Sequence, residues 1–236
     1  MININIFSDF ACPWCYIGEK RLEDAITNLG MNADVNIYYH AFELDPHAST
    51  EGEVTSAERI AAKYNLPLER AKKKVAQIDN VGKELGLDFN YSGAIPTNTF
   101  DAHRLMKLAE HSYDNETVQK VNQGLFDAYF TRNLLISDPK VLTEIGVNAG
   151  MEERDITDML KSDQYKEDVI NDENQAHNLG ISGVPYIIID GKMAIPGAVS
   201  TEDFMDAINH VNTVKLKEAG TSCNVQTCDE NGCRVN

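Results

Sequence analysis

Two cysteines near the N-terminus have the spacing of a thiol–disulfide exchange site. The motif reads Cys12-Pro13-Trp14-Cys15 and follows the alternating apolar segment 2–7, which predicts a strand that leads into a helix. One helical turn brings the two sulfurs together, and the unpaired N–H groups at the start of a helix favour a thiolate on Cys12. We therefore predict that Cys12 is the nucleophile and that the more buried Cys15 resolves the mixed disulfide.

The two residues between the cysteines fit this interpretation. Pro13 suits an early helical position, because its missing N–H needs no partner there. Trp14 provides an apolar surface beside the sulfur for substrate contact, although simple packing also explains it. Zinc binding by Cys12 and Cys15 is the alternative chemistry, but a single pair without a second pair in the core argues against it, and we predict no metal site.

Three further cysteines lie in the polar C-terminal segment, where they are Cys223, Cys228 and Cys233. Asn231-Gly232 favours a tight turn that would bring Cys228 and Cys233 within bridging distance. One hypothesis is an auxiliary redox switch that exchanges with the N-terminal pair. A loose tail with adventitiously oxidised thiols and a zinc site remain the alternatives.

Composition restricts the classes of function. The formal net charge of −16 argues against a nucleic-acid surface and against affinity for anionic membrane, and no apolar stretch is long enough to span a bilayer. Met1 runs directly into the predicted strand without a basic leader or a signal-type segment, so we expect a cytoplasmic protein. Cysteines confined to the two ends exclude a structural disulfide framework and favour catalytic or metal-binding roles.

The surrounding pattern predicts an α/β fold. A strand, a helix over 19–29 and a second strand over 35–40 form a β-α-β unit, and 184–195 reads as a β-hairpin before a last helix that starts at Thr201. Most of the chain between them is helical in period. The expected division is a first thioredoxin-like part at 1–50, a helical insertion at 51–179, a second thioredoxin-like part at 180–215 and a cysteine-containing tail at 216–236.

Five segments together resemble the DsbA-type thioredoxin superfamily, and more narrowly its FrnE-like branch, which is related to the 2-hydroxychromene-2-carboxylate isomerases and the kappa-class glutathione transferases. The segments, within about residues 1–215, are Cys12-Pro13-Trp14-Cys15, Gly180-Ile181-Ser182-Gly183-Val184-Pro185, Gly197-Ala198, Asn98 to Leu105 and Leu125 to Phe130. The resemblance implies a thioredoxin-like fold with a large helical insertion. It also slightly favours the switch hypothesis, because some members of this branch carry extra C-terminal cysteines.

The resemblance further implies a cis peptide bond before Pro185, facing the disulfide. A cis bond would turn the Val184 backbone outward, where it can hydrogen-bond an extended substrate. The alternative is a trans proline that opens an edge strand. We expect Pro185 to belong to the catalytic site and Val184 to the substrate-binding surface.

Proton transfer from the buried thiol is where this sequence departs from the family pattern. Thioredoxin and DsbA carry an acid six residues before the first cysteine, and this chain has Ile6 there. Asp9 and Glu19 are expected at the surface, which leaves water or a group of the helical insertion. His103 is the candidate in that insertion, although a structural role is the alternative. Asn98 and Arg104 are expected to line the same cleft as substrate-binding residues.

The sequence thus favours a disulfide oxidoreductase that reduces or isomerises protein disulfides, with protein or small-molecule thiols as partners. We expect no bound cofactor, and glutathione or a thioredoxin-type system as the electron partner. The second hypothesis is a glutathione-dependent isomerase or transferase acting on a small electrophilic or aromatic substrate, against which Cys15 argues. A holdase that binds unfolded chains is the third. The sequence leaves the oligomeric state open.

Overall fold

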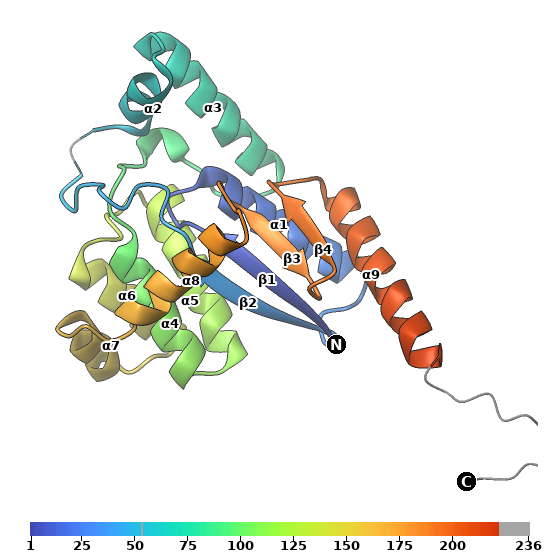
Figure 1. Cartoon of the computed structure of the whole chain (residues 1–236). Coiled ribbons are helices and arrows are strands. Elements are labelled where there is room, and N and C mark those ends of the chain that lie inside the picture. The colour runs from blue at the N-terminus through green and yellow to red at the C-terminus, as the bar shows by residue number, and fades with distance from the viewer. Residues whose placement is uncertain (53, 222–236) are drawn as a thin grey trace, which may run out of the picture.

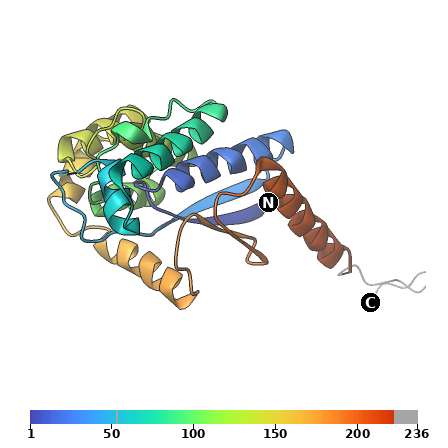
Figure 2. The same ribbon diagram turned by 90° about the horizontal axis from the view of Figure 1, so that it is seen from above.

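A four-stranded sheet with helices on both faces forms the framework of the protein (Figures 1 and 2). The structure is a computed structural model, which describes residues 1–52 and 54–221. The predicted tail site therefore lies outside the described residues, and it comprises Cys223, Cys228 and Cys233. Among the described helices, none combines the length and apolarity needed to cross a bilayer.

The strands are β1 (Ile2–Ser8), β2 (Val35–Ala41), β3 (Tyr186–Ile189) and β4 (Met193–Pro196), in the spatial order β2-β1-β3-β4. β1 pairs in parallel with β2, while β1–β3 and β3–β4 are antiparallel. The hairpin between β3 and β4 turns through Asp190 and Gly191, which both have positive φ. The β-α-β unit and the β-hairpin predicted from the sequence are both present.

Alternation along β1 decides what each face of the sheet contacts. Ile2, Ile4 and Ile6 are buried in one cluster with apolar residues of α1 (Pro13–Asn28) and α9 (Thr201–Thr221). Phe7 points to the opposite face, where it packs against α8 (Lys166–Asn178). Figure 2 shows α1 and α8 on opposite sides of the sheet. Ser8 continues the even-numbered series and therefore faces α1.

The helical insertion lies between β2 and β3 in the chain. Its elements, besides α8, are α2 (Ser56–Tyr64), α3 (Leu68–Glu84), the short 3-10 helix Tyr91–Gly93, α4 (Phe100–Ser112), α5 (Asn115–Phe130), α6 (Pro139–Ala149) and α7 (Glu153–Leu160). Local signals set several of their ends. Thr55 and Glu58 form a capping box before α2, Asp114 caps α5, and Asp138 precedes Pro139 at the first position of α6.

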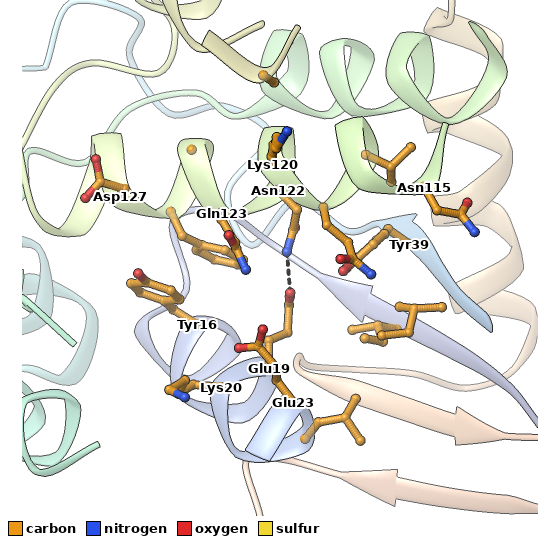
Figure 3. Close-up of a pocket in the computed structure, with 18 of the residues that line it drawn as sticks. Tyr16, Glu19, Lys20, Glu23, Tyr39, Asn115, Lys120, Asn122, Gln123 and Asp127 are labelled. Atoms are coloured by element: carbon orange, nitrogen blue, oxygen red, sulfur yellow. Dashed lines mark hydrogen bonds between the residues drawn. The ribbon is translucent and has the colours of Figure 1, made fainter. Parts of the chain in front are cut away.

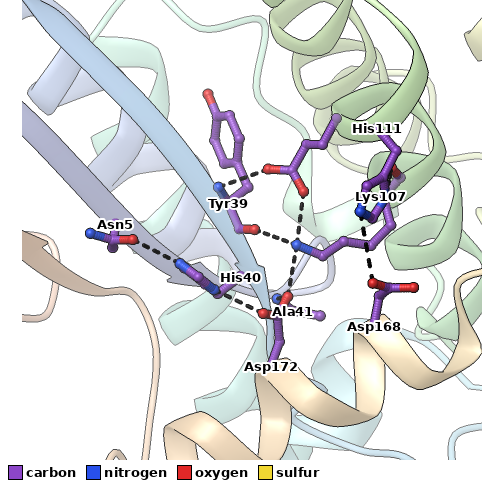
Figure 4. A network of polar contacts seen from close by, with 9 residues as sticks. Asn5, Tyr39, His40, Ala41, Lys107, His111, Asp168 and Asp172 are labelled. Carbon is purple, nitrogen blue, oxygen red and sulfur yellow. Dashed lines mark hydrogen bonds and ion pairs between the residues drawn. The ribbon is translucent and has the colours of Figure 1, made fainter.

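Side chains of α4 and α8 satisfy the free edge of the sheet (Figure 4). β2 is an edge strand, so part of its backbone has no neighbouring strand. The Tyr39 N–H donates to Glu110 at 3.0 Å, and Lys107 donates to the Tyr39 carbonyl at 2.6 Å. Asp172 accepts from the Ala41 N–H at 2.9 Å and pairs with Lys107 at 2.8 Å. This network attaches the helical insertion to the sheet.

The last helix, α9, extends past residue 215, where the second thioredoxin-like part was expected to end. α9 runs to Thr221, so the boundary between residues 215 and 216 falls within a helix.

Candidate active site

The Cys12-Pro13-Trp14-Cys15 motif lies where β1 passes into α1. Cys12 is the N-cap of α1 with an extended backbone, and Pro13 takes the first helical position. The Cys15 N–H donates to the Cys12 carbonyl at 3.0 Å, so the two cysteines share the first turn. Both are free thiols in this structure, and the Cys12 side chain lies near enough to raise the pKa of the Cys15 thiol.

The two sulfur-bearing residues differ in access. Cys15 has no exposed surface, whereas Cys12 keeps 4% and Trp14 beside it keeps 40%. The Cys12 thiol donates to the Val184 carbonyl at 3.6 Å, although the two residues are 172 positions apart in the chain. The Val184–Pro185 bond is cis, as the resemblance implied.

The segment that carries Pro185 is fixed from two sides. The Gly197 N–H donates to the Pro185 carbonyl at 2.8 Å, and Arg21 of α1 donates to the Ala198 carbonyl at 2.8 Å. Gly18, on the next turn of α1 after Cys15, lets this segment approach. A Cβ at Gly18 would lie 3.2 Å from Pro185 Cγ and 3.2 Å from Ala198 Cβ. The helix that bears the cysteines therefore also positions Pro185.

Cys15 is held mostly in its protonated form. Burial raises the pKa of the Cys15 thiol well above its usual range, and the neighbouring Cys12 side chain raises it further. The nearby Asp9 backbone and Ser8 hydroxyl oppose this effect, because both favour the thiolate. A buried thiol of this kind needs an acceptor for its proton before it can attack.

The expectation that Asp9 lies at the surface was wrong. Its side chain is 2% exposed and accepts from the N–H groups of Ala11 at 3.1 Å and Leu44 at 2.8 Å. Burial alone would raise the pKa of this carboxyl, but His103 and the two N–H groups outweigh burial and lower it. Asp9 therefore stays ionised and holds the loop before Cys12, whose N–H donates to the Asp9 carbonyl at 2.9 Å.

His103 is buried at the base of this loop. Its Nε2 lies 3.7 Å from Asp9 Oδ1, and its ring centroid is 5.0 Å from that of Phe10. The structure thus places His103 against Asp9, although its Nε2 has no hydrogen-bond partner among the described residues, and it places Ser8 near Cys15. This arrangement favours a role in holding the loop over the role of proton acceptor for Cys15.

Asn98 and Arg104 have structural partners away from the cysteines. Asn98 Nδ2 lies 3.3 Å from a Glu43 carboxylate oxygen and from the Pro46 carbonyl, and its Oδ1 accepts from the Phe100 N–H. The Arg104 guanidinium pairs with Asp101 at 2.7 Å and binds carbonyls of the segment 159–164. Their expected place in the cleft rested on the resemblance of segment 98–105, which does not specify where each side chain points.

Glu19 was also expected at the surface, and the structure places it elsewhere. It lies one turn after Cys15 on α1, where it is partly buried and accepts from the Ser8 hydroxyl at 2.9 Å and from Asn122 Nδ2 at 2.6 Å. Burial raises the pKa of Glu19 to about 7. The spacing of four residues from Cys15 was the available signal, since residues i and i+4 share one helical face.

A cavity of about 1040 Å³ lies between α1, α5 and the β2 side of the sheet (Figure 3). Glu19 and Asn122 face each other in its wall, as the dashed hydrogen bond in Figure 3 shows. Within the described residues, no three His, Cys, Asp or Glu side chains converge as a metal site.

Comparisons with known proteins identify the family to which this fold belongs. A model of the DSBA-like thioredoxin domain matches residues 3–209. The uncharacterized protein YwbO of Bacillus subtilis is 24% identical over 213 residues, which cover 88% of this chain and 96% of that protein. A probable DsbA oxidoreductase from Streptomyces coelicolor superimposes with a TM-score of 0.82 at 26% identity, with complete coverage of both chains.

A more distant structure has the same fold. The cytosolic disulfide reductase DsbM from Pseudomonas aeruginosa, solved with GSH, gives a TM-score of 0.60 at 13% identity over 91% of this chain and 99% of that chain. The match of the domain model extends from β1 to α9 and includes both cysteines and the cis proline. With its mixed α/β sheet and helical insertion, this chain belongs to the DsbA-like thioredoxin domain family.

Proposed function

We propose that the protein is a thiol–disulfide oxidoreductase that reduces or isomerises protein disulfides. The main supporting observation is the pair of free thiols that share the first turn of α1 and differ in access. A substrate disulfide reaches Cys12 before Cys15, because only Cys12 retains exposed surface. In the broader sense, members of this family are oxidoreductases or isomerases.

The reaction proceeds by two thiol–disulfide exchanges. The Cys12 thiolate attacks one sulfur of the substrate disulfide, forms a mixed disulfide and expels the other substrate sulfur as a thiolate that takes up a proton. Cys15 then loses its proton and attacks the Cys12 sulfur, which releases the second substrate thiol. Two electrons pass from the protein dithiol to the substrate, and the protein is left with a Cys12–Cys15 disulfide.

The surroundings of Cys12 provide a binding surface for an extended substrate. Trp14 presents an exposed aromatic face beside the thiol, and Pro13 keeps the first turn of α1 free of an unsatisfied N–H. The half-buried Val184 already places its carbonyl within hydrogen-bond distance of Cys12. An extended substrate segment would pair with the Val184 backbone and bring its sulfur to Cys12.

Regeneration of the dithiol requires an external thiol. Two molecules of glutathione, or one thioredoxin-type dithiol, would reduce the Cys12–Cys15 disulfide through the same exchange chemistry. The distant neighbour crystallised with GSH is described as a cytosolic disulfide reductase, which supports a cytoplasmic reductase over a net oxidant. A reducing glutathione pool favours that direction of electron flow.

A trapping experiment tests the proposal. In the Cys15→Ser variant the mixed disulfide on Cys12 cannot be resolved, so substrate proteins should accumulate as adducts that a reductant releases. The Cys12→Ser variant is the matched control and should trap nothing through this site. Absence of adducts in Cys15→Ser, together with no disulfide reductase activity in the unaltered protein, would contradict the proposal. Turnover of a small electrophile with glutathione in that case would instead indicate the isomerase hypothesis.

A further inference from the structure

Resolution of the mixed disulfide poses a proton-transfer problem inside the protein. Cys15 has no exposed surface, so water does not reach its thiol directly. The position six residues before Cys12 is occupied by Ile6, which cannot accept a proton. Asp9 is poorly suited to this role, because its carboxylate already accepts from the N–H groups of Ala11 and Leu44, and its pKa is lowered. The route must therefore begin at another polar group that contacts Cys15.

Ser8 is that group. It follows Ile2, Ile4 and Ile6 on the face of β1 that α1 covers, so the alternation of the strand turns its hydroxyl toward α1. The Ser8 hydroxyl donates to Glu19 Oε1 at 2.9 Å, and it lies near enough to Cys15 to lower the pKa of the buried thiol. It is 5% exposed, and it joins the buried thiol to a carboxylate.

We propose that Ser8 and Glu19 form the proton route of the resolving step, in which Glu19 accepts the Cys15 proton through the Ser8 hydroxyl. This inference rests on the proposed oxidoreductase function. A hydroxyl has one hydrogen to donate and two lone pairs to accept with. When Glu19 is ionised, Ser8 donates to it and can accept from the Cys15 S–H. When the proton has moved, Glu19 donates to Ser8 and Ser8 donates to the Cys15 thiolate.

The bonding of Glu19 suits both protonation states. The Asn122 amide donates to the Glu19 carboxylate at 2.6 Å, and Asn122 Oδ1 is buried without a hydrogen-bond partner among the described residues. Rotation of the amide by half a turn would present Oδ1 to a protonated Glu19. The orphaned oxygen therefore offers a second acceptor, used after the proton has left Ser8 and resides on Glu19 Oε2.

The cavity next to Glu19 gives the proton an exit to solvent (Figure 3). Exposed Glu23 and Lys120 line the same cavity of about 1040 Å³, so it reaches the protein surface. In the resolving step Cys15 gives up its proton along this route and attacks Cys12. The departing substrate thiolate takes up a proton from water, so charge is balanced.

The surroundings of Glu19 bring its pKa close to neutral pH. The pKa of Glu19 is raised to about 7, because burial and, to a lesser extent, Glu23 raise it more than the bonds from Asn122 and Ser8 lower it. An acceptor with a pKa near the working pH is the most effective one. The other titratable side chains that line the cavity are Tyr16 and Lys20 on α1, Tyr39 on β2, Lys120 and Asp127 on α5, and Arg132.

A stopped-flow experiment with a bis-nitrobenzoate disulfide reagent separates the two exchange steps. Attack by Cys12 releases one coloured thiolate, and attack by Cys15 on the resulting mixed disulfide releases the second. The full-length protein is used with Cys223→Ser, Cys228→Ser and Cys233→Ser, so that only the active-site pair reacts. The first phase reports on the proposed function, and the second phase reports on the proton route.

We expect the second phase to accelerate with pH around a midpoint near 7, where Glu19 ionises. Glu19→Gln should slow this phase by about tenfold to a hundredfold near neutral pH and abolish that midpoint, while the first phase is unchanged. Ser8→Ala should have a similar effect, and the double variant should be no slower than the single ones, since both act in one route. Glu23→Gln is the matched control, expected within about twofold, with a slightly lower midpoint.

The outcomes distinguish the two claims. Normal first and second phases in Glu19→Gln and Ser8→Ala, with unchanged pH profiles, would overturn the proton route and leave the oxidoreductase function intact. A missing second phase in the unaltered pair would instead contradict the function itself. Should a variant fail to fold, the pH profile of the unaltered pair still decides, because a second phase without a midpoint near 7 excludes Glu19.

Discussion

Replacement of Glu19 by glutamine should change how the stability of the protein depends on pH. Burial raises the pKa of Glu19 from 4.5 to about 7 in the folded chain. The native state therefore binds the proton more tightly than the unfolded state does. The stability that this proton contributes is fully present below about pH 4.5 and is lost as the pH rises through about 7. Glutamine is neutral throughout and has no such loss.

The size of the effect follows from the two pKa values. Each tenfold difference in proton affinity corresponds to about 1.4 kcal/mol, which gives an upper limit of about 3 kcal/mol. Glu19 is partly exposed to the cavity, so water reduces this value to about 2 kcal/mol. Glutamine can keep the local bonds, because its oxygen accepts from Ser8 and its amide can donate to the unpartnered Oδ1 of Asn122. The two proteins should thus be similar in stability at about pH 5.

The assay is equilibrium unfolding in urea under reducing conditions, followed by the fluorescence of Trp14, the single tryptophan, and by circular dichroism. Between about pH 5 and about pH 8, the Glu19→Gln variant should gain about 2 kcal/mol over the unaltered protein, or roughly 4–8 °C in melting temperature. Glu43, whose pKa burial raises to about 7, is present in both proteins and cancels in the difference.

The control is Glu23→Gln, which removes an exposed carboxylate from the same helix and should change the pH dependence little. A stability difference between Glu19→Gln and the unaltered protein that stays constant from about pH 5 to about pH 8 would refute the reasoning. A difference that shrinks with rising pH would refute it as well, because the sign would then be reversed.

Three further predictions concern the contact between α1 and Pro185, the ion pairs at the edge of β2, and the surface beside Cys12. Gly18→Ala should destabilise the fold by about 1–3 kcal/mol, measured by urea unfolding, because its Cβ would crowd Pro185 at 3.2 Å. The Gly18→Ala variant should also reduce disulfides more slowly. A variant that reduces them as fast as the unaltered protein would contradict the role of Gly18 in positioning Pro185. Asp172→Asn should cost about 2–4 kcal/mol at neutral pH, because Lys107 and His40 lose an anionic partner. The pKa of Asp172 is lowered in the folded protein, because Lys107 and His40 outweigh the effect of burial. The stability that ionised Asp172 contributes is therefore lost as the pH falls through this lowered pKa, so the difference in stability between the Asp172→Asn variant and the unaltered protein should become smaller in acid. Trp14→Ala should change the free energy of unfolding by no more than about 1 kcal/mol, because Trp14 is 40% exposed. It should raise the KM for a protein disulfide, and an unchanged KM would exclude contact between Trp14 and the substrate.

Local sequence patterns were sufficient for the framework. The alternation of residues 2–7, the helical period after Cys15 and the Asp190-Gly191 turn predicted the β-α-β unit and the hairpin that the structure contains. These signals work because the burial of one face repeats every two residues in a strand and about every 3.6 in a helix.

The polar interior was beyond the reach of such patterns. Asp9 was expected at the surface because charged side chains usually are, yet Leu44 and Ala11 supply the N–H groups that make its burial tolerable. The network of Lys107, Glu110 and Asp172 at the edge of β2 likewise joins residues that no local pattern connects. The positions of such buried charged groups depend on hydrogen-bond and ion-pair partners from distant parts of the chain, and the local periodicity of apolar residues does not show these partners.

The sequence by itself determined that two thiols lie in the first turn of a helix, since four consecutive residues and their flanking periodicity contain that information. Only the tertiary structure decided which groups surround the buried thiol. The Ser8 hydroxyl reaches both Cys15 and Glu19 because α1 packs on the even-numbered face of β1, and Asn122 meets Glu19 from 103 residues away. Hydrogen bonds and desolvation depend on distances between elements, and these are set only when the elements pack.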